Sequence, residues 1–208
     1  SKKFVESPLF WSKKDGYWEG ISWQDASVQV KKLASLLMVC GISKGDRVLI
    51  ASENRPEWSI SDLAIMSIGA IVVPTYTSNT EEDNSYLLSH SKAKLAITSG
   101  GNVASRLCLA ADANKDIKNI ILLDAKPENF SVKGCNILSW DEEMKKIDTD
   151  DKIEQEVGKI SDEDVCCFIY TSGTGGRPKG VMLTHRSILS NIFACSDVIK
   201  GVEIKEKV

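Results

Sequence analysis

The sequence predicts an α/β fold in which a mostly parallel sheet is covered by helices on both faces. The first observation is a set of short, continuously apolar runs, such as Val48-Leu49-Ile50-Ala51 and Ile120-Ile121-Leu122-Leu123. Strands of this kind are buried on both faces, which is typical of parallel sheets. The second observation is that these runs alternate with amphipathic helical segments. With 208 residues, 42% of them hydrophobic and 26% charged, the chain suits one globular domain or part of a larger one.

The expected elements follow from apolar periodicity and from the residues that start and stop helices. Strands are expected at residues 47–52, 70–74, 95–98, 119–124 and 165–170, with a short apolar strand at 181–183 and a short hairpin within 16–22. Helices are expected at residues 23–38, 57–69, 81–91, 102–113 and 185–198. Ser22, Thr80 and Thr184 are expected N-caps. The charged segment 145–164 predicts a solvated helix or a connector.

Composition argues against several classes of protein. A net charge of −3 lacks the basic footprint of a nucleic-acid-binding protein. The six cysteines form no CxxC pair, so reduced thiols are expected rather than a zinc site or a disulfide framework. The first residues contain no apolar h-region, and no apolar run approaches the roughly 18 residues that a membrane span needs. A cytoplasmic protein is therefore expected, with peripheral membrane contact left open.

Residues 171–180 form a glycine-rich loop directly after the expected buried strand at 165–170. Glycines let the backbone approach a ligand closely, and inward-pointing N–H groups form an anion-binding nest. Lys179 and Arg177 add positive charge, and Pro178 stiffens the exit. The glycines are Gly173, Gly175, Gly176 and Gly180, and the hydroxyl-bearing residues are Thr171, Ser172 and Thr174. This combination predicts a polyphosphate site at the carboxyl end of the strand, where parallel sheets bind ligands.

Two familiar phosphate-binding patterns do not fit this loop. A Walker loop needs G-x-x-x-x-G-K-[ST], but here Pro178 precedes Lys179 and Gly180 follows it. The dinucleotide pattern G-x-G-x-x-G begins at Gly173 and Gly175 but places Pro178 at its third glycine. The alternative from the residues alone is a flexible surface loop, which hydroxyl groups and a lysine after a buried strand disfavour.

The run YTSGTGGRPKGVMLTH at residues 170–185 resembles the phosphate-loop signature of the AMP-forming acyl- and aryl-adenylating enzymes. That family includes acyl-CoA synthetases, luciferases and the adenylation domains of nonribosomal peptide synthesis. Residues 21–58 and 63–98 are similar to two further blocks of the family, and TYTSNTEE at 75–82 is most similar to bacterial long-chain fatty acyl-CoA synthetases. One departure is Gly175, where the family commonly has threonine. We expect it to loosen the loop without abolishing phosphate binding.

The resemblance implies that residues 1–208 are the amino-terminal part of one AMP-binding (adenylation) domain, layered helix–sheet–helix, without the carboxyl-terminal lid domain. It implies an ATP- and Mg²⁺-dependent ligase that joins a carboxylic acid, here a long-chain fatty acid, to coenzyme A through acyl-AMP. The implied ligand-binding residues are Thr171, Ser172, Gly173, Thr174, Gly175, Gly176 and Lys179. Lys179 and Thr174 are the implied catalytic residues, and Thr174 is also the implied magnesium contact. The piece alone is expected to be inactive and to expose apolar surface.

Two other functions remain open at this point. A related adenylating enzyme would load the thiol of a carrier protein instead of coenzyme A. A non-catalytic nucleotide-binding module would be favoured if 208 residues were the whole natural product. His185 has a structural interpretation at a helix start and a functional one near the nucleotide or acyl pocket. His90 is interpreted as a surface or packing residue, and Tyr76 and Tyr170 as packing residues.

Overall fold

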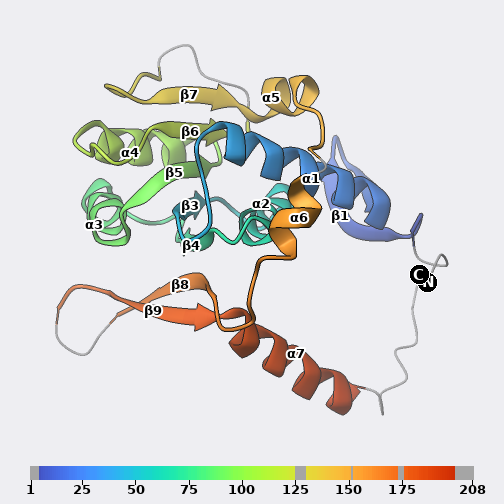
Figure 1. The fold of residues 1–208 in the computed structure, drawn as a ribbon. Helices are drawn as coiled ribbons and strands as arrows, with labels where there is room; N and C mark the ends of the chain where they lie inside the picture. Colours follow the sequence, from blue (N-terminus) through green and yellow to red (C-terminus); the bar gives the residue numbers. More distant parts are fainter. Residues whose placement is uncertain (1–4, 125–129, 151, 173–175, 200–208) are drawn as a thin grey trace.

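A computed structural model describes residues 5–124, 130–150, 152–172 and 176–199 of the chain. Its centre is a seven-stranded sheet with the order β7-β6-β5-β3-β4-β8-β9 (Figure 1). Neighbouring strands in this sheet run parallel, except that β8 and β9 form an antiparallel pair at one edge. The strands are β3 (Arg47–Ala51), β4 (Ile71–Thr75), β5 (Ala93–Thr98), β6 (Asn119–Leu122), β7 (Asn136–Ser139), β8 (Val165–Thr171) and β9 (Lys179–Thr184).

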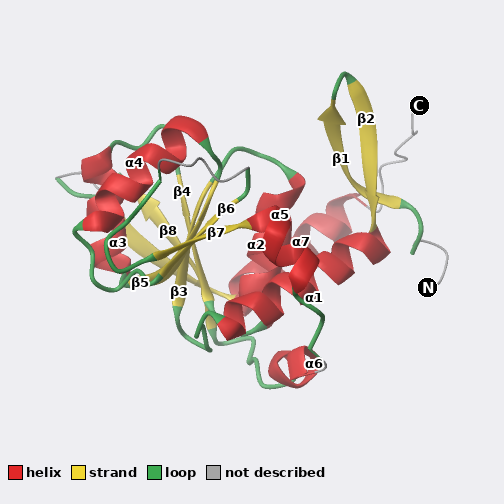
Figure 2. Cartoon of the chain, turned by 90° about the horizontal axis from the view of Figure 1, so that it is seen from above, coloured by secondary structure: helices red, strands yellow, loops and turns green. Residues whose placement is uncertain are grey.

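Helices cover both faces of the sheet (Figure 2). Helices α1 and α2 pack against each other on one face, and α3 and α4 pack on the other. The helices are α1 (Trp23–Val39), α2 (Pro56–Ser67), α3 (Glu81–Ser91), α4 (Gly101–Asp112), α5 (Trp140–Lys146), α6 (Lys152–Val157) and α7 (His185–Ile199). The predicted α/β fold, a mostly parallel sheet between helix layers, is therefore confirmed.

Each central strand sends alternate side chains into two separate apolar cores. In β3, Val48 and Ile50 face the side of α1 and α2, whereas Leu49 and Ala51 face the side of α3 and α4. All four side chains are buried, so the run from Val48 to Ala51 is apolar at every position rather than at alternate positions. Strands β4, β5 and β6 divide their side chains in the same way. This two-sided burial is the physical origin of the apolar runs in the sequence.

Two of the predicted N-caps, Ser22 and Thr80, are confirmed. The Ser22 side chain accepts a hydrogen bond of 3.0 Å from the Asp25 amide and so caps α1. At α3, the Thr80 hydroxyl accepts from the Asp83 amide, and the Asp83 carboxylate accepts from the Thr80 amide. These two reciprocal bonds form a capping box, which fixes the position at which α3 begins.

Some elements differ from the sequence prediction. The amino-terminal hairpin is longer than residues 16–22, because it pairs β1 (Pro8–Lys14) with β2 (Tyr17–Ser22). Its turn is at Asp15 and Gly16, which both have positive φ. Strand β7 and helix α5 are not predicted by the sequence, because β7 has four residues and lies at the sheet edge, where burial is incomplete. Within the charged segment 145–164, α6 is a short helix, in agreement with the prediction.

The last strand and the last helix expose apolar side chains, as expected from the sequence. Met182 on β9 and Phe193 on α7 are both 66% exposed, and Ile192 on α7 is 55% exposed. Helix α7 contacts β9 but extends away from the sheet (Figure 1). None of the helices in the described part of the chain is long and apolar enough to cross a bilayer.

Candidate functional site

The candidate phosphate loop is the tip of the antiparallel hairpin formed by β8 and β9. Thr171 is the last residue of β8 and pairs directly with Lys179, the first residue of β9. Because β8 runs parallel to β4, this tip lies on the carboxyl side of the parallel strands. Ligands bind on that side in open α/β sheets. The hairpin therefore brings a hydroxyl-bearing strand end and a lysine together at the expected place.

The predicted ligand-binding residues are only partly covered by the structure. Thr171, Ser172, Gly176 and Lys179 are described, and all of them are exposed. Gly173, Thr174 and Gly175 lie outside the described residues, and with them the expected magnesium contact. In the part of the chain that is described, no three His, Cys, Asp or Glu side chains are grouped so that they could hold a metal ion.

Two described residues of the loop have properties that suit an anionic ligand. Gly176 has a φ of +127°, a backbone conformation that residues with a Cβ rarely adopt. Lys179 has no carboxylate partner among the residues that the structure describes. An exposed ammonium group without a carboxylate partner among these residues, at the strand position paired with Thr171, is suited to bind an anionic ligand.

An aromatic cluster on α3 contacts both ends of this loop. The Tyr86 hydroxyl donates a hydrogen bond of 2.7 Å to the Pro178 carbonyl, and His90 Nδ1 lies 2.8 Å from the Tyr170 hydroxyl. The Arg177 guanidinium lies over the Tyr86 ring, 5.3 Å from its centroid. Tyr170 is buried, so its predicted packing role is confirmed, and burial raises the pKa of its hydroxyl. The sequence prediction missed these contacts, although Tyr86 and His90 are four residues apart on one predicted helix.

A cavity of about 350 Å³ lies beside the aromatic cluster. It is lined by the end of β4, the start of α3, the end of β8 and Pro178. Tyr76 lines this cavity and is 72% exposed, so the prediction that Tyr76 is a packing residue is wrong. The reason is that Tyr76 follows the end of β4, in the loop at the carboxyl edge rather than within the sheet.

His185 lies at the other end of the β8–β9 hairpin. Thr184, the residue before it, pairs with Val165 at the start of β8, and roughly 20 Å of strand separates that point from Thr171. The His185 amide donates to the Asp164 carbonyl, and burial lowers the pKa of its imidazole while Asp164 opposes that shift. This position favours the structural interpretation of His185, at the start of α7.

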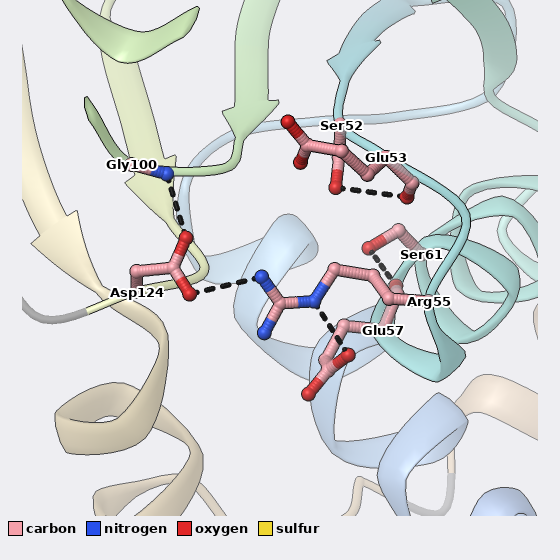
Figure 3. Close-up of polar contacts among 7 residues, drawn as sticks. All are labelled: Ser52, Glu53, Arg55, Glu57, Ser61, Gly100 and Asp124. Atoms are coloured by element: carbon pink, nitrogen blue, oxygen red, sulfur yellow. Dashed lines mark hydrogen bonds and ion pairs between the residues drawn. The ribbon is translucent and has the colours of Figure 1, made fainter. Parts of the chain in front are cut away.

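A second polar cluster joins the loops that follow β3, β5 and β6 (Figure 3). Arg55 Nε lies 2.8 Å from a Glu57 carboxylate oxygen, and Arg55 Nη1 lies 2.9 Å from Asp124 Oδ1. The Gly100 amide donates a hydrogen bond of 2.7 Å to Asp124 Oδ2. Burial alone would raise the pKa of the Asp124 carboxyl, but the bonds from Gly100 and Arg55 lower it below its ordinary value. The ion pair of Arg55 with Asp124 and the hydrogen bond from Gly100 therefore link the three loops.

Replacing Asp124 with asparagine is expected to weaken the acid dependence of stability. A carboxyl whose pKa is lowered by folding stabilises the protein above its unfolded pKa of about 3.9, and that contribution is lost as the pH falls through the lower folded value. The difference in urea midpoint between the wild type and D124N should therefore shrink between about pH 6 and about pH 3. The control is Asp116→Asn, because Asp116 is exposed and its carboxylate has no partner among the described residues. A difference for D124N that stays constant with pH would contradict this account.

A family model described as AMP-binding enzyme matches residues 3–207. Fatty acyl-CoA synthetase A of Dictyostelium discoideum is 34% identical over 197 residues, covering 91% of this chain and 28% of that protein. The long-chain-fatty-acid–CoA ligase FadD15 of Mycobacterium tuberculosis is 29% identical over 178 residues, covering 86% of this chain and 28% of that protein. The chain thus spans about 28% of the length of these curated relatives.

Solved structures agree on the fold. Coronafacic acid ligase from Pectobacterium brasiliense matches with a TM-score of 0.72 at 20% identity, covering 91% of this chain and 34% of that chain. An anthranilate CoA ligase in complex with anthranoyl-AMP matches with a TM-score of 0.70 at 22% identity, covering 81% of this chain and 30% of that chain. The seven-stranded sheet and its helix layers therefore have the fold of one part of these larger proteins.

Proposed function

Because the chain belongs to the AMP-binding enzyme family, we propose that it is part of an ATP-dependent acid–thiol ligase. In the first half-reaction, a carboxylate oxygen attacks the α-phosphorus of ATP, forming acyl-AMP and releasing pyrophosphate. In the second, a thiolate sulfur attacks the acyl carbon, and AMP leaves. The proposed thiol is that of coenzyme A.

The pairing of Thr171 with Lys179 at the hairpin tip is the observation that carries this proposal. Phosphoryl chemistry depends mainly on positioning and on electrostatic stabilisation of charge. We assign to Lys179 the stabilisation of negative charge on the departing pyrophosphate, because its ammonium group is exposed at the site where the two strands end. Thr171 and Ser172 are assigned hydrogen bonds to phosphate oxygens.

The remaining loop residues are assigned from the family pattern alone. Close approach of backbone N–H groups to the β- and γ-phosphates is assigned to Gly173, Gly175 and Gly176. Thr174 is assigned the magnesium contact, because a threonine hydroxyl is an oxygen ligand of the kind that Mg²⁺ binds. When bound, Mg²⁺ would offset the charge of the phosphate oxygens.

A long-chain fatty acid is the proposed acid. Two relatives that match this chain are named as a fatty acyl-CoA synthetase and a long-chain-fatty-acid–CoA ligase, which supports a long-chain acid as the substrate. The proposed location is the cytoplasm, with support from six unpaired cysteines.

Pyrophosphate exchange in the full-length protein tests the reaction and the acid together. The protein is incubated with ATP, Mg²⁺ and radiolabelled pyrophosphate, with palmitate, acetate or benzoate as the acid. We expect palmitate to support exchange at least about tenfold faster than the other two acids, because each buried methylene adds transition-state binding. Exchange with none of the acids would contradict the ligase, whereas a preference for benzoate would contradict only the proposed chain length.

The thiol acceptor is tested in the second half-reaction. Purified palmitoyl-AMP is supplied with either coenzyme A or a carrier protein that bears a phosphopantetheine thiol. Thioester formation with coenzyme A is the expected result. Thioester formation only on the carrier protein would favour the alternative adenylating enzyme.

A further inference from the structure

We propose that α3 clamps both ends of the phosphate loop, and that Tyr86 and His90 are positioning residues for phosphate binding. The effect of these contacts on phosphate binding rests on the proposed function, whereas the contacts themselves are a feature of the structure. Tyr86 and His90 lie one helical turn apart on α3 and hold opposite ends of the loop.

The exit of the loop is held by Tyr86. Its hydroxyl donates a hydrogen bond of 2.7 Å to the carbonyl of Pro178, the residue that precedes Lys179. The Arg177 guanidinium lies 5.3 Å from the centroid of the same ring. Pro178 is itself restricted in φ, so fixing its carbonyl restricts the direction in which the chain enters β9. The contact between Tyr86 on α3 and Pro178 thereby fixes the position of the Lys179 backbone.

The entry of the loop is held by His90 and Tyr170. His90 Nδ1 and the Tyr170 hydroxyl are 2.8 Å apart, and the two rings meet edge to face with centroids 5.6 Å apart. Tyr170 is the residue before Thr171, and its ring packs over Gly180 on the opposite strand. A Cβ added at Gly180 would lie 3.2 Å from Tyr170 Cζ, so a side chain there would press against this ring. Tyr170, on β8, therefore contacts both β9 and α3.

Helix α3 is a rigid base for these contacts. Its inner face is anchored by Leu87 and Leu88, which are buried in the core on that side of the sheet. Its start is fixed by the capping box of Thr80 and Asp83. Both ends of the loop make contacts with α3, which is itself fixed to the core. The distance between Thr171 and Lys179 therefore depends on these contacts as well as on the loop. We infer that loosening the clamp weakens the hold on phosphate in the ground state and in the transition state alike.

Kinetics in the full-length protein test the consequence of the clamp. Tyr86→Phe removes only the hydroxyl that bonds to Pro178, and the loss of one hydrogen bond predicts a KM for ATP that is about three- to tenfold higher. The value of kcat and the KM for the fatty acid should stay within about twofold, because uniform weakening of phosphate binding raises KM alone. A variant that merely misfolds would lower kcat per total protein and leave the KM for ATP unchanged. That pattern would overturn the proposal.

The contact of His90 can be tested with one disruptive and one conservative substitution. His90→Ala should raise the KM for ATP by a similar factor, whereas His90→Asn should restore much of it, because an asparagine side chain can place a polar atom near the position of Nδ1. Tyr17→Phe is the matched control for Tyr86→Phe, since Tyr17 is 78% exposed on the amino-terminal hairpin. Equal KM values for all four variants and the wild type would contradict the positioning role.

Amide hydrogen exchange separates the clamp from the proposed function. In Tyr86→Phe, the ladder amides of β9 nearest the loop, in the segment from Lys179 to Val181, should exchange faster than in the wild type, whether or not the protein has ligase activity. Unchanged exchange at these amides would overturn the clamp. Faster exchange in a protein that shows no pyrophosphate exchange with any acid would support the clamp while contradicting the proposed function.

Discussion

Replacing Lys179 with alanine is expected to slow acyl-adenylate formation by about 100- to 1,000-fold, the usual effect of removing one preorganised group at a developing charge. The charge in question develops on pyrophosphate, which leaves only in the first half-reaction. Lys179 is preorganised because it is the first residue of β9 and pairs in the sheet with Thr171. Thioester formation from supplied acyl-AMP should therefore change little.

Single-turnover measurements of the two half-reactions check this difference in the full-length protein. Lys179→Arg keeps the charge but replaces a compact ammonium by a planar fork, so adenylate formation should fall less than in Lys179→Ala. Lys13→Ala is the control, because Lys13 is an exposed lysine on β1, in a hairpin separate from the seven-stranded sheet. A similar loss in both half-reactions would contradict the assignment of Lys179 to the departing pyrophosphate.

The central strands could be predicted from the sequence because two-sided burial leaves a local signature. Leu49 and Ile50 face different cores, yet both are buried, so the run is apolar regardless of which face is considered. The same signal is weak at β7, where four residues at the sheet edge include Asn136 and Ser139. It is also weak at β1, because that hairpin lies outside the main sheet and keeps most of its side chains in partial contact with water.

The candidate site also has one part that could be predicted from the sequence and one part that could not. The loop could be predicted because its chemistry is local: glycines, hydroxyls and Lys179 follow one another within a few residues. The clamp could not, because the bond between Tyr86 and Pro178 joins residues 92 apart, and the one between His90 and Tyr170 joins residues 80 apart. Such pairs are set by how α3 packs on the sheet, and no local spacing encodes that. The ion pair of Arg55 and Asp124, 69 residues apart, is hidden from sequence analysis for the same reason.

Replacing Ile97 with alanine is expected to lower the free energy of unfolding by about 2–5 kcal/mol, a large part of the roughly 5–15 kcal/mol typical of a domain. Ile97 is fully buried in β5, between Ile50 of β3 and Ile121 of β6. Close-packed neighbours on adjacent strands cannot collapse into the space that the lost atoms leave, so the cost of a cavity adds to the lost burial. Urea denaturation of the 208-residue chain should show a lower midpoint with an unchanged slope.

The matched control is Ile192→Ala on α7, the same chemical change at a side chain that is 55% exposed. It removes atoms that are largely in water and substitutes a better helix former, so stability should change by no more than about 0.5 kcal/mol. A loss at Ile192 as large as that at Ile97 would mean that the apolar face of α7 is covered in solution. A urea midpoint that rises with protein concentration would then identify a second copy of the chain as the cover, because association stabilises the folded state by mass action. A loss below about 1 kcal/mol at Ile97 would instead contradict the packed centre of the sheet, because large-to-small changes in a rigid core cost more than that.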